Sequence, residues 1–145
     1  MEDRGHLGDG EMTKERDRLT YLGKTTTVSF EEALLKVRTE LQKEEFAVLT
    51  DIDVRETFKS RIFREFRNYK ILCACIPRLM YRALNAEDRI GTNMLCNVIV
   101  EELDSSSVEV SALDPLVWST ATENPDVREV AAELRVRLEK ALGRI

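Results

Sequence analysis

The stretch Asn68-Tyr-Lys-Ile-Leu-Cys-Ala-Cys-Ile-Pro77, followed by Asn93-Met-Leu-Cys-Asn-Val-Ile-Val-Glu-Glu-Leu103, decides the fold of this chain. Its first part alternates in the manner of a β-strand, with Tyr69, Ile71, Cys73 and Cys75 on one face and Leu72 and Ala74 on the other. Because both faces are apolar, this strand is predicted to lie in the interior of a sheet. Pro77 suits the first position of a helix, so the strand is expected to lead directly into one.

Upstream of this stretch, the pattern predicts two strands and two helices. Thr25–Val28 is expected to form a first strand, and Phe46–Ile52 a second one. Ser29 opens an amphipathic helix of about four turns, because its spacing from Glu32 is that of a capping box. Asp53 has the same spacing from Glu56 and opens a shorter helix, to about residue 63. The apolar side of that shorter helix is expected to comprise Phe58, Ile62, Phe63 and Phe66.

Downstream, a short helix over 78–87 precedes a long strand over 94–103. Residues 104–107 have the composition of a turn, so a hairpin with a strand over 108–113 is predicted. Asp114-Pro115 ends that strand, and Asn124 caps a final helix that has Pro125 in its first turn.

The predicted order is therefore β-α-β-α-β-α-β-β-α, which is an α+β domain with helices packed on a mixed or antiparallel sheet. Residues 23–145 are expected to form this single domain. Residues 1–22 are mostly charged and rich in glycine, and we expect them to form a flexible tail.

Composition excludes several classes of function. The net charge of −5 disfavours general binding of nucleic acid, and no apolar run approaches the ~18 residues that a membrane span needs. No apolar stretch follows a basic start, so no secretory signal is expected. Three cysteines, an odd number, favour reduced thiols in the cytoplasm. The single histidine is His6 in the predicted tail, so Cys–His and Ser–His catalysis are not expected.

The three cysteines Cys73, Cys75 and Cys96 are the main candidates for a functional site. Cys73 and Cys75 share a strand face with Cα atoms roughly 6.5–7 Å apart, so a disulfide between them would be strained. Cys96 begins a strand that could neighbour the first one, which makes a meeting with Cys75 plausible. The thiols could form a redox pair, a soft-metal site or one reactive thiolate at a helix N-terminus. Alternatively they are small buried hydrophobes. The ligand spacing typical of zinc is absent, so no metal site is predicted, and the sequence specifies no cofactor.

Basic residues form the one concentration of charge against the acidic background, at 59–82. Arg78, Arg67 and Lys70 flank the strand that leads to Pro77, where a helix N-terminus could bind a small anionic ligand. The simpler interpretation is a solvated helix face.

Taken together, several short motifs resemble a bacterial and archaeal family, the domain-of-unknown-function family 302 (DUF 302), over about residues 25–142. The motifs occur in this order: Thr50-Asp-Ile-Asp-Val54, Tyr69-Lys-Ile-Leu72, Cys73-Ala-Cys-Ile-Pro77, Ala83-Leu84, Ile90-Gly91, Cys96-Asn-Val98 and Asp114-Pro115. The resemblance implies a compact α+β fold, commonly a homodimer, without an established reaction. It also implies that Cys75 and Cys96 inherit any site marked by the family's cysteine pair, with Asn97 as a further candidate.

The sequence departs from the family pattern at three positions. Cys73, Ile76 and Leu95 stand where the family has glycine, asparagine and proline. The Ile76 difference removes a polar side chain that a ligand could contact, and Cys73 adds a third thiol.

Three functional hypotheses follow from these observations. The first is a small cytoplasmic binding or accessory protein, dimeric, with a cysteine-lined pocket at the strand-to-helix turn near Pro77. The second is a thiol-based redox or sulfur-handling enzyme that uses Cys75 with Cys96 or Cys73. The third is a structural dimer whose cysteines are buried and inert.

Overall fold

The chain folds as five strands that are connected and covered by helices, in the order predicted from the sequence. The structure is a computed structural model, and it describes residues 21–93 and 95–145. The strands are β1 (Tyr21–Thr26), β2 (Ala47–Asp53), β3 (Tyr69–Cys75), β4 (Cys96–Asp104) and β5 (Ser107–Leu113). The helices are α2 (Phe30–Lys43), α3 (Val54–Ile62), α4 (Pro77–Ala86) and α5 (Pro125–Gly143), with 3₁₀ segments η1 (Asp88–Asn93) and η2 (Pro115–Thr120).

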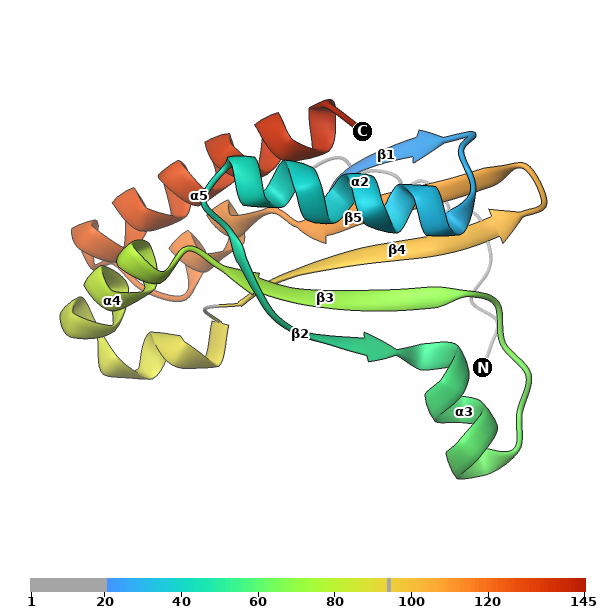
Figure 1. Cartoon of the computed structure of the whole chain (residues 1–145). Helices are drawn as coiled ribbons and strands as arrows, with labels where there is room; N and C mark the ends of the chain where they lie inside the picture. The colour runs from blue at the N-terminus through green and yellow to red at the C-terminus, as the bar shows by residue number, and fades with distance from the viewer. Residues whose placement is uncertain (1–20, 94) are drawn as a thin grey trace, which may run out of the picture.

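The strands form one sheet in the order β1-β5-β4-β3-β2, and every neighbouring pair is antiparallel (Figure 1). The α+β prediction is thus confirmed, and the sheet is purely antiparallel. β3 lies between β2 and β4, as expected for a strand with two apolar faces. β1 and β2 form the two edges.

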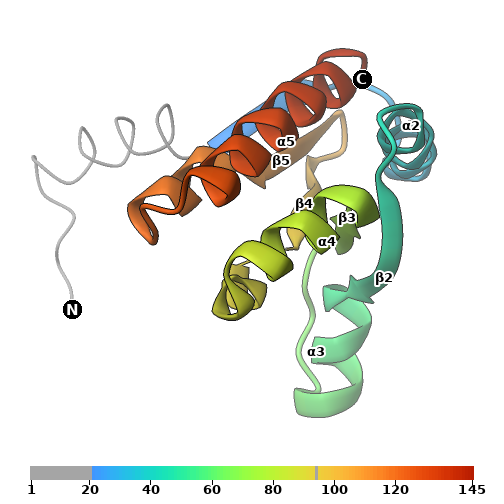
Figure 2. The same ribbon diagram turned by 90° about the vertical axis from the view of Figure 1, so that its left-hand side faces the viewer.

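The helices α2, α4 and α5 lie on one face of the sheet (Figures 1 and 2). Every second residue of a strand points toward the helices, including Val98 and Val100 of β4 and Val108 and Val110 of β5. They pack with the apolar stripe of α5, of which Leu138 is fully buried. Within residues 21–93 and 95–145, no helix covers the other face of the sheet, as is common for an antiparallel sheet.

The predicted helix starts are confirmed by their hydrogen bonds. The Ser29 hydroxyl accepts a bond from the Glu32 amide (3.1 Å), and an Asp53 carboxylate oxygen accepts one from the Glu56 amide (2.9 Å). The Asn124 side chain accepts a bond from the Asp126 amide (2.9 Å) and caps α5. Each cap provides an acceptor for a backbone donor that the helix itself leaves unpaired.

The first strand differs from its predicted position. It spans Tyr21–Thr26 rather than Thr25–Val28, because Leu22 pairs with Ala112 of β5 and packs against the core. Tyr21 and Leu22 were assigned to the tail and belong instead to β1. The rest of the predicted tail, residues 1–20, lies outside the described residues.

Helix α3 also differs from expectation, because none of its residues is buried. It follows the edge strand β2 and lies beyond the edge of the sheet (Figure 1), so neither the sheet nor the other helices pack over it. The rings of Phe58 and Phe66 pack edge to face, with centroids 5.1 Å apart, at the base of the helix. In the described part of the chain, no helix combines the length and apolar character that crossing a bilayer requires.

Candidate functional site

The face of the sheet that α2, α4 and α5 leave uncovered, called the open face below, is the first candidate for a functional surface. Cross-strand pairing arranges its side chains in rows. The row nearest α3 is Thr25, Glu109, Glu101 and Tyr69; the middle row is Gly23, Ser111, Ile99, Ile71 and Ile52; the third row contains Tyr21, Leu113, Asn97, Cys73 and Thr50. The middle row is mostly apolar, so the open face can bury area against a partner.

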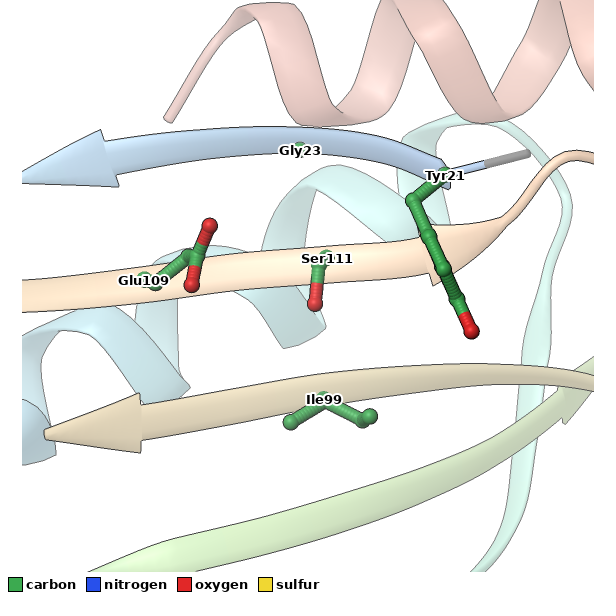
Figure 3. A pocket seen from close by; sticks show the side chains of 5 residues that line it. All are labelled: Tyr21, Gly23, Ile99, Glu109 and Ser111. Atoms are coloured by element: carbon green, nitrogen blue, oxygen red, sulfur yellow. The ribbon is translucent and has the colours of Figure 1, made fainter. Parts of the chain in front are cut away.

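One hollow of about 410 Å³, called the β1–β5 hollow, lies on this face. Its lining residues are Tyr21, Gly23, Ile99, Glu109 and Ser111 (Figure 3). Gly23 leaves room beside Ser111, because a Cβ atom at position 23 would lie 3.2 Å from the Val110 carbonyl oxygen and 3.4 Å from the Ser111 Cβ. A larger residue at position 23 would therefore begin to fill the hollow.

A second hollow of about 240 Å³ lies where β4 begins, and we call it the Asn97 hollow. It is lined by Gly91, Thr92, Asn93, Leu95, Asn97, Leu113 and Trp118. Asn97 was predicted as a site residue, and the structure places it in this lining. Trp118 is the only tryptophan of the chain and is 4% exposed, so its indole forms part of the wall.

The strand register separates the three candidate cysteines. Cys73 pairs with Asn97 and therefore lies on the open face, and Cys75 lies on the same side two residues further along. Cys96 pairs with Ala74, which faces the helices, and it is part of the hydrophobic core. Cys75 and Cys96 thus belong to adjacent strands but point to opposite faces of the sheet. All three cysteines are buried free thiols.

Burial also governs the ionisation of two of these thiols. Desolvation raises the pKa of Cys96 to about 12, and the neighbouring Cys75 adds to this increase. Desolvation likewise raises the pKa of Cys75. A thiol nucleophile needs a lowered pKa, so these shifts run in the direction opposite to that required by the redox hypothesis. Among the described residues, no group of three or more His, Cys, Asp or Glu side chains is arranged to hold a metal ion.

Two of the three basic candidates form ion pairs with carboxylates. Arg78 bonds to Glu45 (2.9 Å) and Glu133 (2.8 Å), and its hydrogen bonds lower the pKa of both carboxyl groups. Arg67 bonds to Glu101 (2.9 Å), and its guanidinium lies 4.4 Å from the centroid of the Phe66 ring.

The third basic candidate, Lys70, is paired in register with Val100, on the side of the sheet that faces the helices. Arg78 lies in the first turn of α4, but Arg67 bonds to Glu101 and Lys70 lies near the start of β3, so the three basic side chains do not converge on the N-terminus of α4.

Sequence reasoning did not identify Tyr21, Gly23, Ser111 or Glu109 as members of a site. One signal was available, because a glycine inside a strand often marks a close approach or a space beside the backbone. The alternation of Glu109 and Ser111 with valines also showed which residues of β5 face away from the core. Which strands lie next to β5 required the tertiary structure.

Comparisons with known proteins bear on the fold and the family. No curated protein matches the sequence. The fold is similar to the crystal structure of an uncharacterized conserved protein DUF302 from Bacillus stearothermophilus, with a TM-score of 0.78 and 22% sequence identity. The match covers 86% of this chain and 96% of that one. A family model described as "Domain of unknown function DUF302" matches residues 22–145. The chain therefore belongs to the DUF302 family.

Proposed function

We propose that this chain is a small binding or accessory protein that acts as a homodimer and holds a small oxygen-bearing molecule in the Asn97 hollow. The observation that carries the proposal is the composition of this lining. Asn93 and Asn97 offer amide donors, whereas Leu95, Leu113 and Trp118 offer apolar surface. The Thr92 hydroxyl donates to the Arg89 carbonyl (3.0 Å) and can only accept from a ligand. A few polar groups in an otherwise apolar concavity are typical of small-molecule sites.

The chemistry of the lining favours a ligand with carboxylate or carbonyl oxygens. The amide N–H groups of Asn93 and Asn97 can donate hydrogen bonds to such oxygens, and the lining carries no formal charge. The anionic ligand expected from the sequence fits these donors. The lining does not include Arg78, Arg67 or Lys70, so the ligand would be held by the amide groups of the hollow and not by these basic side chains.

The proposed role of the cysteines is to support this end of the sheet. Cys73 lies across from Asn97, and Cys96 packs into the core one residue before Asn97. Buried thiols of this kind act as small hydrophobic side chains. We therefore expect Cys73→Ala and Cys96→Ala to change stability more than ligand binding. Such an odd set of free thiols favours a reducing compartment such as the cytoplasm.

The emission of Trp118 provides the test, because this indole lines the hollow and is the only one in the chain. Acetate and acetamide, titrated to millimolar concentrations, are probes of similar shape that differ in charge. A saturable change in emission with acetate supports an anion site, and one with acetamide alone shows a neutral site. Native mass spectrometry of the purified protein would identify any small molecule that the protein retains, and it would measure the oligomeric state.

The matched variants are Asn97→Leu and Asn85→Leu. Asn97→Leu removes an amide from the lining, whereas Asn85 lies on α4 and bonds to the Tyr81 carbonyl outside the hollow. The proposal requires that Asn97→Leu weakens the response and that Asn85→Leu leaves it unchanged. Equal responses in both variants, or no saturable response to either probe, would contradict it.

A further inference from the structure

Helix α3 forms a projection with an exposed apolar tip. It lies beyond the β2 edge and apart from the other helices in both views (Figures 1 and 2). Phe63, which caps its C-terminal end, is 88% exposed, and the preceding Ile62 is 55% exposed. Phe63 also has a positive φ of 56°, a conformation that large side chains rarely adopt. The chain thus holds a large aromatic side chain outward at the end of a helix.

The projection has the opposite charge to the rest of the molecule. Its basic residues are Arg55, Lys59, Arg61, Arg64 and Arg67, and its acidic residues are Glu56 and Glu65. Residues 54–67 therefore carry a net charge of +3 and the remaining residues −8, since the whole chain carries −5. In the described part of the chain, no ion pair is formed by Lys59, Arg61 or Arg64. The basic projection of one copy is therefore complementary in charge to the acidic remainder of a second copy, which favours a contact made through the projection.

The open face offers a matching surface for this tip. The β1–β5 hollow lies beside Gly23, with Ile99 as an apolar wall and Tyr21 at one side (Figure 3). Glu109 lines the hollow, and Glu101, which bonds to Arg67 of its own copy, lies directly across from it on β4. A hollow that combines apolar surface from Ile99 and the Tyr21 ring with an acidic border is complementary to an aromatic tip with basic neighbours.

Symmetry brings the two features together. Suppose that two open faces meet around a two-fold axis that runs parallel to the strands along β3. β2 of one copy then lies over β4 of the other, the segment beyond β2 lies over β5 and β1, and the ends of the strands keep their positions. The α3 end of the sheet is the end that carries Glu109 and Glu101, because Asp53, Lys70 and Tyr69 meet there. Such an isologous contact places α3 of each copy over the hollow of the other.

We infer that in the homodimer Phe63 of each copy enters the β1–β5 hollow of the other copy, with Arg61 and Arg64 facing the acidic border. This inference rests on the homodimer of the proposed function and names its contact surface. The sheet contact alone is small, since three overlapping strands at the usual spacings span a patch of roughly 300 Å². A stable dimer buries about 800 Å² per partner, so the two α3 contacts supply area that the sheets lack.

The first test is Phe63→Gly, with dissociation constants measured by analytical ultracentrifugation. Glycine suits the positive φ at this position, so the variant removes the aromatic side chain without destabilising the monomer. Loss of a central aromatic contact is expected to weaken the dimer by about thirtyfold or more. Leu35→Ala is the control, because Leu35 is 67% exposed on α2, on the opposite layer. Its dissociation constant should equal that of the unmodified chain.

The second test locates the contact directly. A chain with Phe63→Cys and Ser111→Cys should form a covalent dimer when oxidised glutathione converts the two thiols to a disulfide. A chain with Leu35→Cys and Ser111→Cys should remain monomeric on a denaturing gel. The native cysteines are the same in both chains and are buried.

The outcomes separate this inference from the proposed function. If the unmodified chain is monomeric at all concentrations, the homodimer fails and the inference fails with it. If the chain is dimeric but Phe63→Gly dissociates no more readily than Leu35→Ala, the inference alone is overturned. Cross-linking through position 35 but not through position 63 would overturn it too. Binding of acetate at the Asn97 hollow is independent of all three results.

Discussion

The Cys96 thiol is expected to stay protonated and unreactive in the folded protein. It is 5% exposed within the core, and burial raises its pKa to about 12. At pH 8 such a thiol is ionised to roughly one part in ten thousand, whereas a cysteine of the unfolded chain, with a pKa of about 8.5, is ionised to roughly a quarter. Because the thiolate is the reacting species, alkylation in the folded state should be slower by more than about a thousandfold.

Iodoacetamide labelling at pH 8, followed by mass spectrometry of the digested protein, measures this rate. The same reaction in guanidinium chloride provides the rate for the unfolded chain. The labelling rate of Cys75 provides an internal comparison: burial also raises its pKa, so its labelling should also be slower in the folded protein than in the unfolded chain. Modification of Cys96 in the folded protein within tenfold of its unfolded rate would refute the reasoning from burial. It would also favour the hypothesis of a reactive thiol.

Three further predictions concern stability. The folded pKa of Cys96 lies above the unfolded value of about 8.5, so the stability contributed by this thiol is complete below about pH 8 and is lost as the pH rises toward 12, at about 1.4 kcal/mol per pH unit. Urea denaturation at several pH values should show this loss of stability, and Cys96→Ala should make the loss smaller. Leu72→Ala should lower the free energy of unfolding by about 2–5 kcal/mol, because Leu72 is fully buried in β3. The exposed Leu35→Ala should change it by less than about 0.5 kcal/mol, and similar urea midpoints for the two variants would contradict the assigned core. Asn124→Ala removes the cap of α5 and should cost about 1 kcal/mol in thermal or urea unfolding, whereas an unchanged midpoint would show that the cap is replaceable.

Much of the local structure was predictable from neighbouring residues. Ser29, Asp53 and Asn124 begin helices because their side chains accept hydrogen bonds from amides two or three residues later. Pro77 begins α4 because its fixed φ suits that position. These interactions are short in sequence, so the pattern alone contains the partners.

The candidate site was less predictable, because it depends on pairing between distant strands. A shift of one residue in register moves a side chain to the other face of a sheet. Cys96 pairs with Ala74 rather than with Cys75, and it therefore joins the core cluster beneath the helices, whereas Cys75, although also buried, points to the other face of the sheet. No local pattern specifies that register. Asn97 was identified from the family resemblance, yet its hollow also needs Leu113 and Trp118 from later segments.

The sequence by itself determined the order of strands and helices, the helix caps and the interior position of β3. Alternation, capping and helical periodicity act within one segment, so these features were readable without a fold. Only the tertiary structure decided that the sheet is antiparallel, that α3 lies beyond its edge, and which of the residues between Asn68 and Leu103 face the core or the open face. The physical reason is that these features depend on which strands become neighbours, and that choice depends on the free energy of the whole packed chain.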